Sequence, residues 1–395
     1  MADGIEEQLK ALDQTTMTPL VRSALGRGGI EVGDWHCQPV FGGVEMASSL
    51  YRFSGDAQAG GGTIPWTLIL KIAQSPPGDS DDPQGVRYWK REALAYQSGL
   101  LSDLPGDLAA PRCYEATEGP NGTYWIWMED IKDEIGDQWP LEHYGTVARC
   151  LGHFNGAYLA GKPLPSYPWL TRRWLRKYVE NAASAVERML NSMDHPLIRR
   201  ALSGLTPEFM RRVWEERHAI LEAIERLPQT LCHLDAFRRN LFARRNAEGH
   251  EQVVAVDWSY MGIAAVGEEL APLVGASIGF YAVMPADALK LEDIVLQGYT
   301  EGLRDAGWQC DPDLLRFGYA ATLFWRYAIG AFAGEAVAWM LDERYHATIE
   351  QAMGRSMPEL AYHTAAQIDF SLHVYEQASR LRATLSKLVR TGDHL

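Results

Sequence analysis

The chain has 395 residues, 47% of them apolar and 22% charged, which fits a globular protein of two structural units or one large bilobal unit. Its formal net charge of −14 disfavours nucleic-acid binding, because general nucleic-acid binders usually present a basic face. The five cysteines are scattered and form no Cys-x-x-Cys pair, which argues against a disulfide framework and a structural zinc site and favours a reducing compartment.

The N-terminal stretch, residues 1–14, is polar and acidic and lacks the apolar core of a signal peptide. The longest nearly uncharged run, residues 270–284, is too short to span a bilayer and contains glycine and proline. We interpret this run as a buried helix. The expectation is a cytoplasmic protein without a membrane segment.

The first third of the chain predicts a small sheet with one helix. The first thirty residues have the pattern of a single amphipathic helix, so residues 1–35 are expected to form a helical extension. Between Cys37 and Met128 most segments have strand-like patterns, and residues 75–85 have the composition of a solvated loop. Residues 87–101 show helical spacing of large apolar residues, and a hairpin with an Asn-Gly turn follows.

After residues 129–140 the pattern becomes mostly helical. Residues 231–257 are an exception, because they predict a short hairpin with residues 246–249 in its turn. The predicted fold class is therefore α+β and bilobal: a small β-rich N-lobe with one key helix, residues 36–130, precedes a larger helical C-lobe, residues 131–395. The helices are expected at residues 141–161, 169–193, 206–226, 285–305, 311–342 and 357–389.

The segment "LCHLDAFRRNLF", residues 231–242, places an acid and an amide beside the predicted hairpin. Asn240 begins the first hairpin strand and Asp257 follows the second, so antiparallel pairing brings them together, with Asp235 on the loop just before. Two carboxylates and an amide form an oxygen-rich site that suits Mg²⁺. The alternative is that each residue merely caps or closes a turn; the combination favours the functional interpretation.

Lys71 lies within the apolar strand "LILKIA", where an unpaired ammonium would be costly to bury. Glu92 on the next predicted helix is the natural partner, and a lysine held by a glutamate can present its ammonium to a phosphate. The alternative is a lysine on an edge strand whose ammonium reaches water.

These residues together resemble a known family. "HLDAFRRN" matches the pattern His-x-Asp-x-x-x-x-Asn of protein-kinase-like catalytic loops, and "DWSYMG" resembles the metal-binding segment that follows it. "FGGVEMASSLYRF", "LILK", "WKREALAY" and "WMED" come in the matching order before them. Over roughly residues 36–275 the chain therefore resembles the aminoglycoside phosphotransferase and choline kinase superfamily, which has a protein-kinase-like fold.

The resemblance implies a role for each motif residue. Asp235 would be the catalytic base that orients the acceptor hydroxyl, Asn240 and Asp257 would hold Mg²⁺, and His233 would brace the loop. Lys71, fixed by Glu92, would contact the α- and β-phosphates of ATP. Backbone groups would cover the phosphates around Gly42, Gly43, Ser48 and Ser49 and bind adenine near Glu129 and Ile131.

The sequence also departs from the family pattern. Leu234 stands where the family often has glycine, and Phe237 stands where it usually has histidine or lysine. Arg238 or Arg239 would supply the missing positive charge, and Arg238 is taken as the second catalytic candidate. The glutamates of "VGEELA", Glu268 and Glu269, are expected to support the catalytic loop, and the glycines of "AGGG", residues 59–62, are expected in a hairpin turn.

The function implied is an ATP-dependent phosphotransferase that moves the γ-phosphate to a hydroxyl of a small molecule of aminoglycoside, sugar or amino alcohol type. The acceptor, whether cationic or sugar-like, would lie against the aromatic C-lobe, with Trp258 and Tyr260 as candidates for its pocket wall. The sequence leaves open ATP or GTP as donor and the oligomeric state.

Two other functions are compatible with the sequence. One is a catalytically weak nucleotide-binding module of the same fold, suggested by Phe237 and the loose glycine loop. The other is a metal-dependent hydrolase built on His233, Asp235 and Asp257, which needs further ligands such as His36, His143 or His153.

Overall fold

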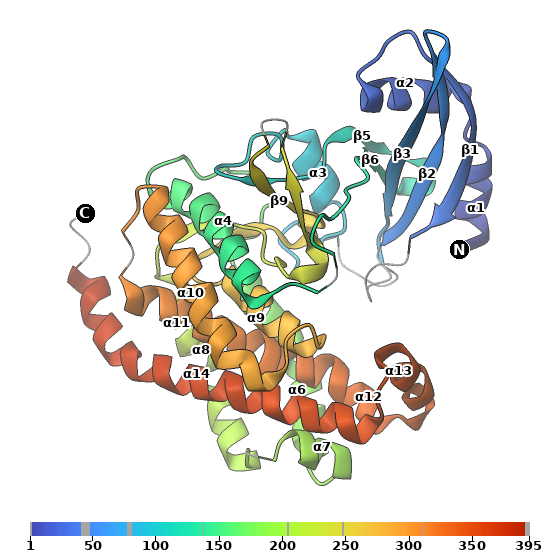
Figure 1. The fold of residues 1–395 in the computed structure, drawn as a ribbon. Coiled ribbons are helices and arrows are strands. Elements are labelled where there is room, and N and C mark those ends of the chain that lie inside the picture. Colours follow the sequence, from blue (N-terminus) through green and yellow to red (C-terminus); the bar gives the residue numbers. More distant parts are fainter. Residues whose placement is uncertain are drawn as a thin grey trace.

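A computed structural model describes residues 2–40, 48–76, 81–136, 138–203, 205–246, 249–309 and 311–391. The N-terminal sheet lies at one end of the molecule and the helical part at the other, with the hairpin that carries β9 (Glu251–Ala255) between them (Figure 1). Among the described residues, none of the helices combines the length and the apolar character that crossing a bilayer requires.

The N-terminal sheet has five antiparallel strands in the order β1-β2-β3-β6-β5. The turn between β2 and β3 contains Gly60 and Gly61 with φ of 56° and 90°, which only glycine adopts readily, and this confirms the predicted hairpin turn. The strands are β1 (Glu31–Pro39), β2 (Ser48–Ala59), β3 (Gly62–Ala73), β5 (Cys113–Glu118) and β6 (Tyr124–Met128).

The alternation of side chains along β3 assigns its residues to two cores. Leu68 and Leu70 pack with Met17 and Leu20 of α2 on one face. The next strand position, Lys71, points to the opposite face, where Ala73 packs with Ala93 of α3 (Arg91–Gln97). The period of two therefore turns the one lysine of this strand toward the helix that carries Glu92.

The first thirty residues form two helices, so the prediction of a single helix is wrong. α1 (Ala2–Lys10) and α2 (Gln14–Leu25) are separated at Asp13, whose side chain accepts a hydrogen bond from the backbone N–H of Thr16 at 3.1 Å. An aspartate in this position starts a new helix rather than continuing the old one. β1 begins at Glu31, five residues before the start predicted for the N-lobe.

The C-terminal part is mostly helical, and its long helices lie where the sequence predicts them. The predicted helix at 169–193 is divided in two, and the one at 311–342 has a π-helical middle, Phe324–Ala336. The α-helices of this part are α4 (Leu141–Leu159), α5 (Trp174–Asn181), α6 (Ala183–Asn191), α7 (Pro196–Ala201), α8 (Pro207–Glu225), α9 (Leu270–Gly279), α10 (Ala288–Asp305), α11 (Pro312–Leu323), α12 (Val337–Leu341), α13 (His346–Met353) and α14 (Met357–Thr391).

Two small sheets hold the loops of the C-terminal part. One has the order β4-β9-β8 and contains the predicted hairpin; the other pairs β10 with β7. Their strands are β4 (Leu108–Ala109), β7 (Gln229–Cys232), β8 (Leu241–Arg245) and β10 (Gly262–Ala265). The segment between the two parts is tied to the N-terminal sheet by a two-bond ion pair, since Arg52 donates to Asp130 at 2.8 and 3.0 Å.

Glu292 on α10 is 4% exposed, and within the described residues its Oε1 atom has no hydrogen-bond partner. Burial raises the pKa of this carboxyl to about 7, and Arg316 only partly opposes the rise. The folded protein therefore binds this proton more tightly than the unfolded chain does. The stability gained from the neutral form is present below pH about 4.5 and is lost as the pH rises through about 7.

We expect Glu292→Gln to stabilise the protein more at pH 8 than at pH 5, by about 2 to 3 kcal/mol, because glutamine removes the charge that must be buried at pH 8. Urea denaturation at the two pH values measures the difference. Glu187→Gln, at an exposed position of α6, is the matched control and should change little at either pH. An equal effect of Glu292→Gln at both pH values would contradict the buried titration.

Candidate active site

One buried glutamate holds the backbone of the predicted catalytic loop, residues 233–240. Glu269, fully buried, accepts hydrogen bonds from the N–H of His233 at 2.6 Å and the N–H of Leu234 at 3.0 Å. Its neighbour Glu268 accepts from the N–H of Ala265 at 2.7 Å. Glu269 supports the loop, as the sequence predicts, whereas Glu268 holds the backbone of β10 instead. Leu234, the residue before Asp235, has a φ of 65°. This left-handed conformation costs a leucine roughly 1–2 kcal/mol.

His233 braces the loop in its neutral form. Its Nδ1 accepts from the N–H of Asp235 at 3.1 Å, so Nε2 carries the proton and donates to the carbonyl of Val256 at 2.9 Å. Burial lowers the pKa of His233 to about 4. Because both ring nitrogens are used in this way, His233 is not available as a metal ligand.

Asp235 lies at the mouth of the loop with both carboxylate oxygens engaged. Oδ1 accepts from Nη2 of Arg326 at 2.6 Å, and Oδ2 accepts from Nδ2 of Asn240 at 2.9 Å. The same Nδ2 donates to the backbone carbonyl of Asp235 at 3.0 Å. These two bonds orient the Asn240 amide so that its carbonyl oxygen faces away from Asp235.

Lys71, Glu92 and Asp257 form an ionic cluster from three separate elements. The Lys71 ammonium lies 2.5 Å from Oε2 of Glu92 and 2.9 Å from Oδ1 of Asp257. The other oxygen of Glu92 accepts from the N–H of Trp258 at 3.3 Å. Lys71 is 8% exposed and sits on β3, between β2 and β6, so the alternative of an edge-strand lysine reaching water is wrong.

Charge balance in this cluster follows from burial and pairing. Burial works against the Lys71 ammonium, but Asp257 and Glu92 more than offset it and hold the pKa of Lys71 above its ordinary value. Burial also opposes the charge of Asp257, yet Lys71 lowers the pKa of this carboxyl to about 2. Burial raises the pKa of Glu92 despite Lys71. The side chain of Asp257 is 40% exposed, so it is the member of the cluster that faces solvent.

The hairpin brings Asn240 and Asp257 to one rim, as expected. Leu241 of β8 pairs with Ala255 of β9, and the N–H of Val256 donates to the carbonyl of Asn240 at 2.9 Å. An ionised carboxylate and an oriented amide oxygen are ligands that suit Mg²⁺, which takes few protein ligands and keeps the rest for water and phosphate. The donor set therefore fits the predicted metal.

The metal hydrolase alternative finds no support in the residues that the structure describes, because they contain no group of three or more His, Cys, Asp or Glu able to hold a metal. Of the distant histidines, His143 instead packs on Trp139 and lies 3.6 Å from Glu251. An exposed His36 lies on β1.

Arg238, predicted as catalytic, is buried and binds the segment between β6 and α4. Its Nη2 lies 2.8 Å from Asp133 and also donates to the carbonyl of Gly136, and its guanidinium stacks 4.8 Å from the Trp139 ring. Arg239 is exposed and stands over the Phe280 ring at 4.4 Å. Arg238 thus anchors the catalytic loop, and the guanidinium bound to Asp235 belongs to Arg326.

Arg326 is not among the residues predicted from the sequence, although the sequence contains a signal for it. Arg326 is the one charged residue in the run "FGYAATLFWRYAIGAFAG", residues 317–334. A lone charge in such a run must find a buried partner. That partner, Asp235, lies 91 positions away and cannot be identified from local spacing.

The remaining predicted residues lie at the start of β2, after β6 or outside the described residues. Gly42 and Gly43 lie outside them. The backbone of Ser48 and Ser49 begins β2, opposite Ala73 and Ile72 of β3. Glu129 follows β6; its N–H donates to the carbonyl of Arg112 at 2.9 Å, and Ile131 comes two residues later, half-buried.

The aromatic pair predicted as a pocket wall lies deeper than expected. Trp258 is fully buried and donates from Nε1 to the carbonyl of Ala255 at 2.8 Å, so the prediction that it lines a pocket is wrong. Its residue type suits the core because its one polar atom finds a partner there. Tyr260 is 9% exposed and packs against Trp174.

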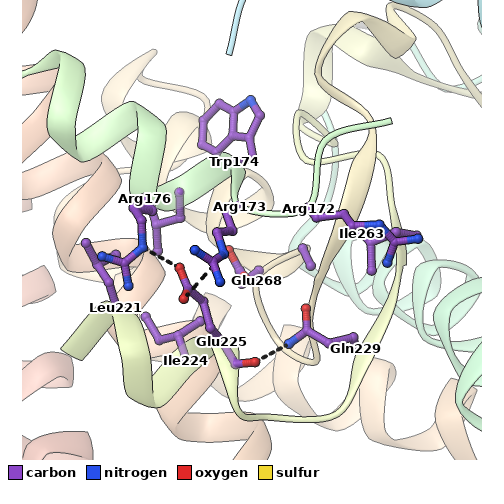
Figure 2. A pocket seen from close by; sticks show the side chains of 12 residues that line it. Arg172, Arg173, Trp174, Arg176, Leu221, Ile224, Glu225, Gln229, Ile263 and Glu268 are labelled. Carbon is purple, nitrogen blue, oxygen red and sulfur yellow. Dashed lines mark hydrogen bonds and ion pairs between the residues drawn. The ribbon is translucent and has the colours of Figure 1, made fainter. Parts of the chain in front are cut away.

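A small pocket lies behind the loop, between α5, α8 and β10 (Figure 2). Figure 2 shows Arg173 and Arg176 turned toward Glu225, at 3.7 and 2.6 Å. The residues around this pocket do not include Lys71, Asp235 or Asp257. Its wall does include Trp174 and Glu268, which adjoin the supports of the catalytic loop.

The chain is similar in sequence to a phosphotransferase family and in fold to solved kinases. The profile of the Phosphotransferase enzyme family (APH) matches residues 58–308. An amicoumacin kinase in complex with AMP-PNP, Ca²⁺ and Ami has 13% identity and a TM-score of 0.50, over 92% of this chain and 96% of that one. A choline kinase from Cryptosporidium parvum Iowa II has 13% identity and a TM-score of 0.50, over 95% and 99%. No curated protein matches the sequence.

These likenesses confirm the predicted α+β, kinase-like fold. The family profile also covers the segments that carry Lys71, Glu92, Asp235, Asn240 and Asp257.

We expect the buried His233 to make stability depend on pH. Its folded pKa of about 4 lies below the ordinary 6.5, so the unfolded chain takes up the proton first and stability is lost as the pH falls from about 6.5 to about 4. Between pH 7 and pH 5 this group removes about 2 kcal/mol from the wild type and nothing from His233→Gln. Urea denaturation of both proteins at the two pH values measures it.

The destabilisation caused by His233→Gln should therefore be larger at pH 7 than at pH 5. Glu268 and Glu269, whose pKa burial raises to about 7, contribute the opposite slope in both proteins and cancel in the comparison. His250→Gln, an exposed histidine next to the hairpin turn, is the control. Equal destabilisation by His233→Gln at both pH values would refute a neutral, buried His233.

Proposed function

Because the chain belongs to the phosphotransferase enzyme family, we propose that it transfers the γ-phosphate of ATP to a hydroxyl group of a small molecule. The observation that carries the proposal is the convergence of five side chains from β3, α3, the catalytic loop and the hairpin. They are Lys71, Glu92, Asp235, Asn240 and Asp257.

Lys71 supplies positive charge for phosphoryl transfer, and Asn240 and Asp257 at the end of the hairpin supply oxygen ligands at fixed positions. The reaction has a loose transition state with charge spread over the phosphoryl oxygens, so catalysis comes mostly from positioning and charge neutralisation. Lys71, held by Glu92, presents its ammonium at the rim formed by Asp257. When bound, Mg²⁺ would neutralise phosphate charge there, held by Asp257 and the carbonyl oxygen of Asn240.

Asp235 would orient the acceptor hydroxyl and receive its proton late in the transfer. Its carboxylate already accepts from Arg326 and Asn240, which fixes its direction. A loose transition state asks for a well-placed acceptor atom more than for a strong base, so this arrangement suits the reaction.

The surface next to the catalytic loop supports an acceptor with a flat or ring-shaped face. Phe237 stacks on Phe280 at 5.6 Å, and Phe280 is 37% exposed. The exposed Arg239 stands over the Phe280 ring and adds a positive charge to this surface. Of the aminoglycoside, sugar and amino alcohol types, this favours a sugar-like acceptor over a polycation.

We expect Asp235→Asn to lower the kcat of acceptor-dependent ADP release by about 10²- to 10⁴-fold, because the amide cannot take up the hydroxyl proton. The thermal shift caused by Mg·ATP should persist, because Lys71 and Asp257 are intact. The assay uses a panel of sugars, amino alcohols and aminoglycosides with ATP and with GTP.

Asp103→Asn, at an exposed position outside the site, is the control and should keep the wild-type kcat. Wild-type turnover by Asp235→Asn would overturn the proposed role of Asp235. A nucleotide-induced thermal shift with no turnover on any acceptor would favour the nucleotide-binding module instead.

A further inference from the structure

Both polar backbone groups of Leu234 are held by buried side chains. Its N–H donates to Glu269 at 3.0 Å, and its carbonyl accepts from Nη1 of Arg326. A left-handed leucine is strained, and such a conformation persists only where the surroundings over-determine it. The residue that follows is Asp235, so the direction in which its carboxylate points depends on this one strained peptide.

Arg326 is built into the C-terminal part and cannot move freely. It is 6% exposed, and its guanidinium lies 4.5 Å from the Trp174 ring, 5.2 Å from the Tyr327 ring and 5.9 Å from the Tyr260 ring. These rings come from three different elements. A guanidinium stacked on aromatic faces stays charged and directed, because its remaining N–H groups can still donate in the plane.

The backbone around Arg326 is also unusual. Arg326 lies in the π-helical segment Phe324–Ala336, which continues directly from α11. π-helical turns are rare and occur frequently at functional sites. In this chain the segment delivers a buried cation to a loop that lies 91 positions earlier in the sequence.

We propose that Arg326 is the positioning residue of the phosphotransferase: its guanidinium fork holds the Leu234 carbonyl and the Asp235 carboxylate at once, and so fixes the catalytic carboxylate. The inference rests on the proposed function. Nη1 binds the carbonyl and Nη2 binds Oδ1 at 2.6 Å, so two adjacent acceptors are matched by two adjacent donors. The same group supplies the positive charge that Phe237, two residues after Asp235, cannot supply.

Holding both acceptors requires the two adjacent N–H donors of the Arg326 guanidinium and not only its positive charge. A lysine ammonium at position 326 would keep a positive charge near Asp235, but a single nitrogen does not reproduce the planar pair of donors. A glycine at position 234 would remove the need for restraint, because glycine adopts positive φ without strain. These two substitutions separate the charge of Arg326 from its restraint of the backbone.

The test measures kcat and the KM for ATP in full-length Arg326→Met and Arg326→Lys with the best acceptor. We expect kcat to fall by about 10²-fold in Arg326→Met, as for a misplacement of about 1 Å, and by less in Arg326→Lys. The KM for ATP should stay within about threefold, because Lys71 and the hairpin rim are untouched. Arg316→Met, on α11 and bonded to Gln377, is the matched control and should keep the wild-type kcat.

The decisive comparison adds Leu234→Gly to Arg326→Met. If Arg326 acts by restraining the strained peptide, the double variant regains about tenfold in kcat over Arg326→Met. Leu234→Gly alone loses stability, since the leucine side chain is buried, and its kcat is the reference against which the double variant is compared. An Arg326→Met enzyme with wild-type kcat would overturn the inference, and so would equal losses in kcat by Arg326→Met and Arg316→Met.

Failure of the proposed function is distinguished by a measurement that needs no turnover. If the wild type transfers phosphate to no acceptor, amide hydrogen exchange of residues 231–242 still tests whether Arg326 restrains this loop. Faster exchange of this segment in folded Arg326→Met or Arg326→Lys, with unchanged exchange in Arg316→Met, supports the restraint by Arg326. Unchanged exchange in the Arg326 variants overturns it.

Discussion

The site depends first on the buried ammonium of Lys71. Taking an ammonium out of water costs several kcal/mol unless opposite charges replace the lost hydration, and removing one partner from such a group costs roughly 3–5 kcal/mol. Glu92 and Asp257 meet this need from α3 and from the end of the hairpin. One electrostatic requirement therefore ties the N-terminal sheet, its helix and the C-terminal hairpin together. It also leaves Asp257 partly exposed at the rim.

A second constraint fixes the loop that faces this cluster. Leu234 and Asp257 both have positive φ, at 65° and 62°, and both adjoin or carry a carboxylate of the site. Strain of this kind is stored where surrounding groups enforce it. For Leu234 the enforcing groups are Glu269 and Arg326, and for Asp257 the Lys71 ammonium holds the side chain. The two carboxylates are thus held by contacts that come mostly from buried parts of the chain.

Much of this site could be predicted from the sequence because its signals are local. A lysine in an apolar strand indicates a buried partner of opposite charge. The two ends of an antiparallel hairpin must lie close together, which places Asn240 and Asp257 at one rim. The ranges of the long C-terminal helices followed from periodicity, whereas the break at Asp13 between α1 and α2 did not. Arg326 could not be assigned, since its contact with Asp235 spans 91 positions and depends on a π-helical segment. Trp258 was misplaced because spacing does not distinguish a pocket wall from a core position.

The proposed function requires that Asp257, with Asn240, form a divalent-cation and phosphate site beside Lys71. Calorimetric titration of the full chain with ATP, with and without Mg²⁺, tests it most directly. We predict one site per chain, at least about tenfold tighter binding with Mg²⁺, and loss of that gain in Asp257→Asn. An affinity for ATP that Mg²⁺ does not change, or that Asp257→Asn leaves equally dependent on Mg²⁺, would contradict it.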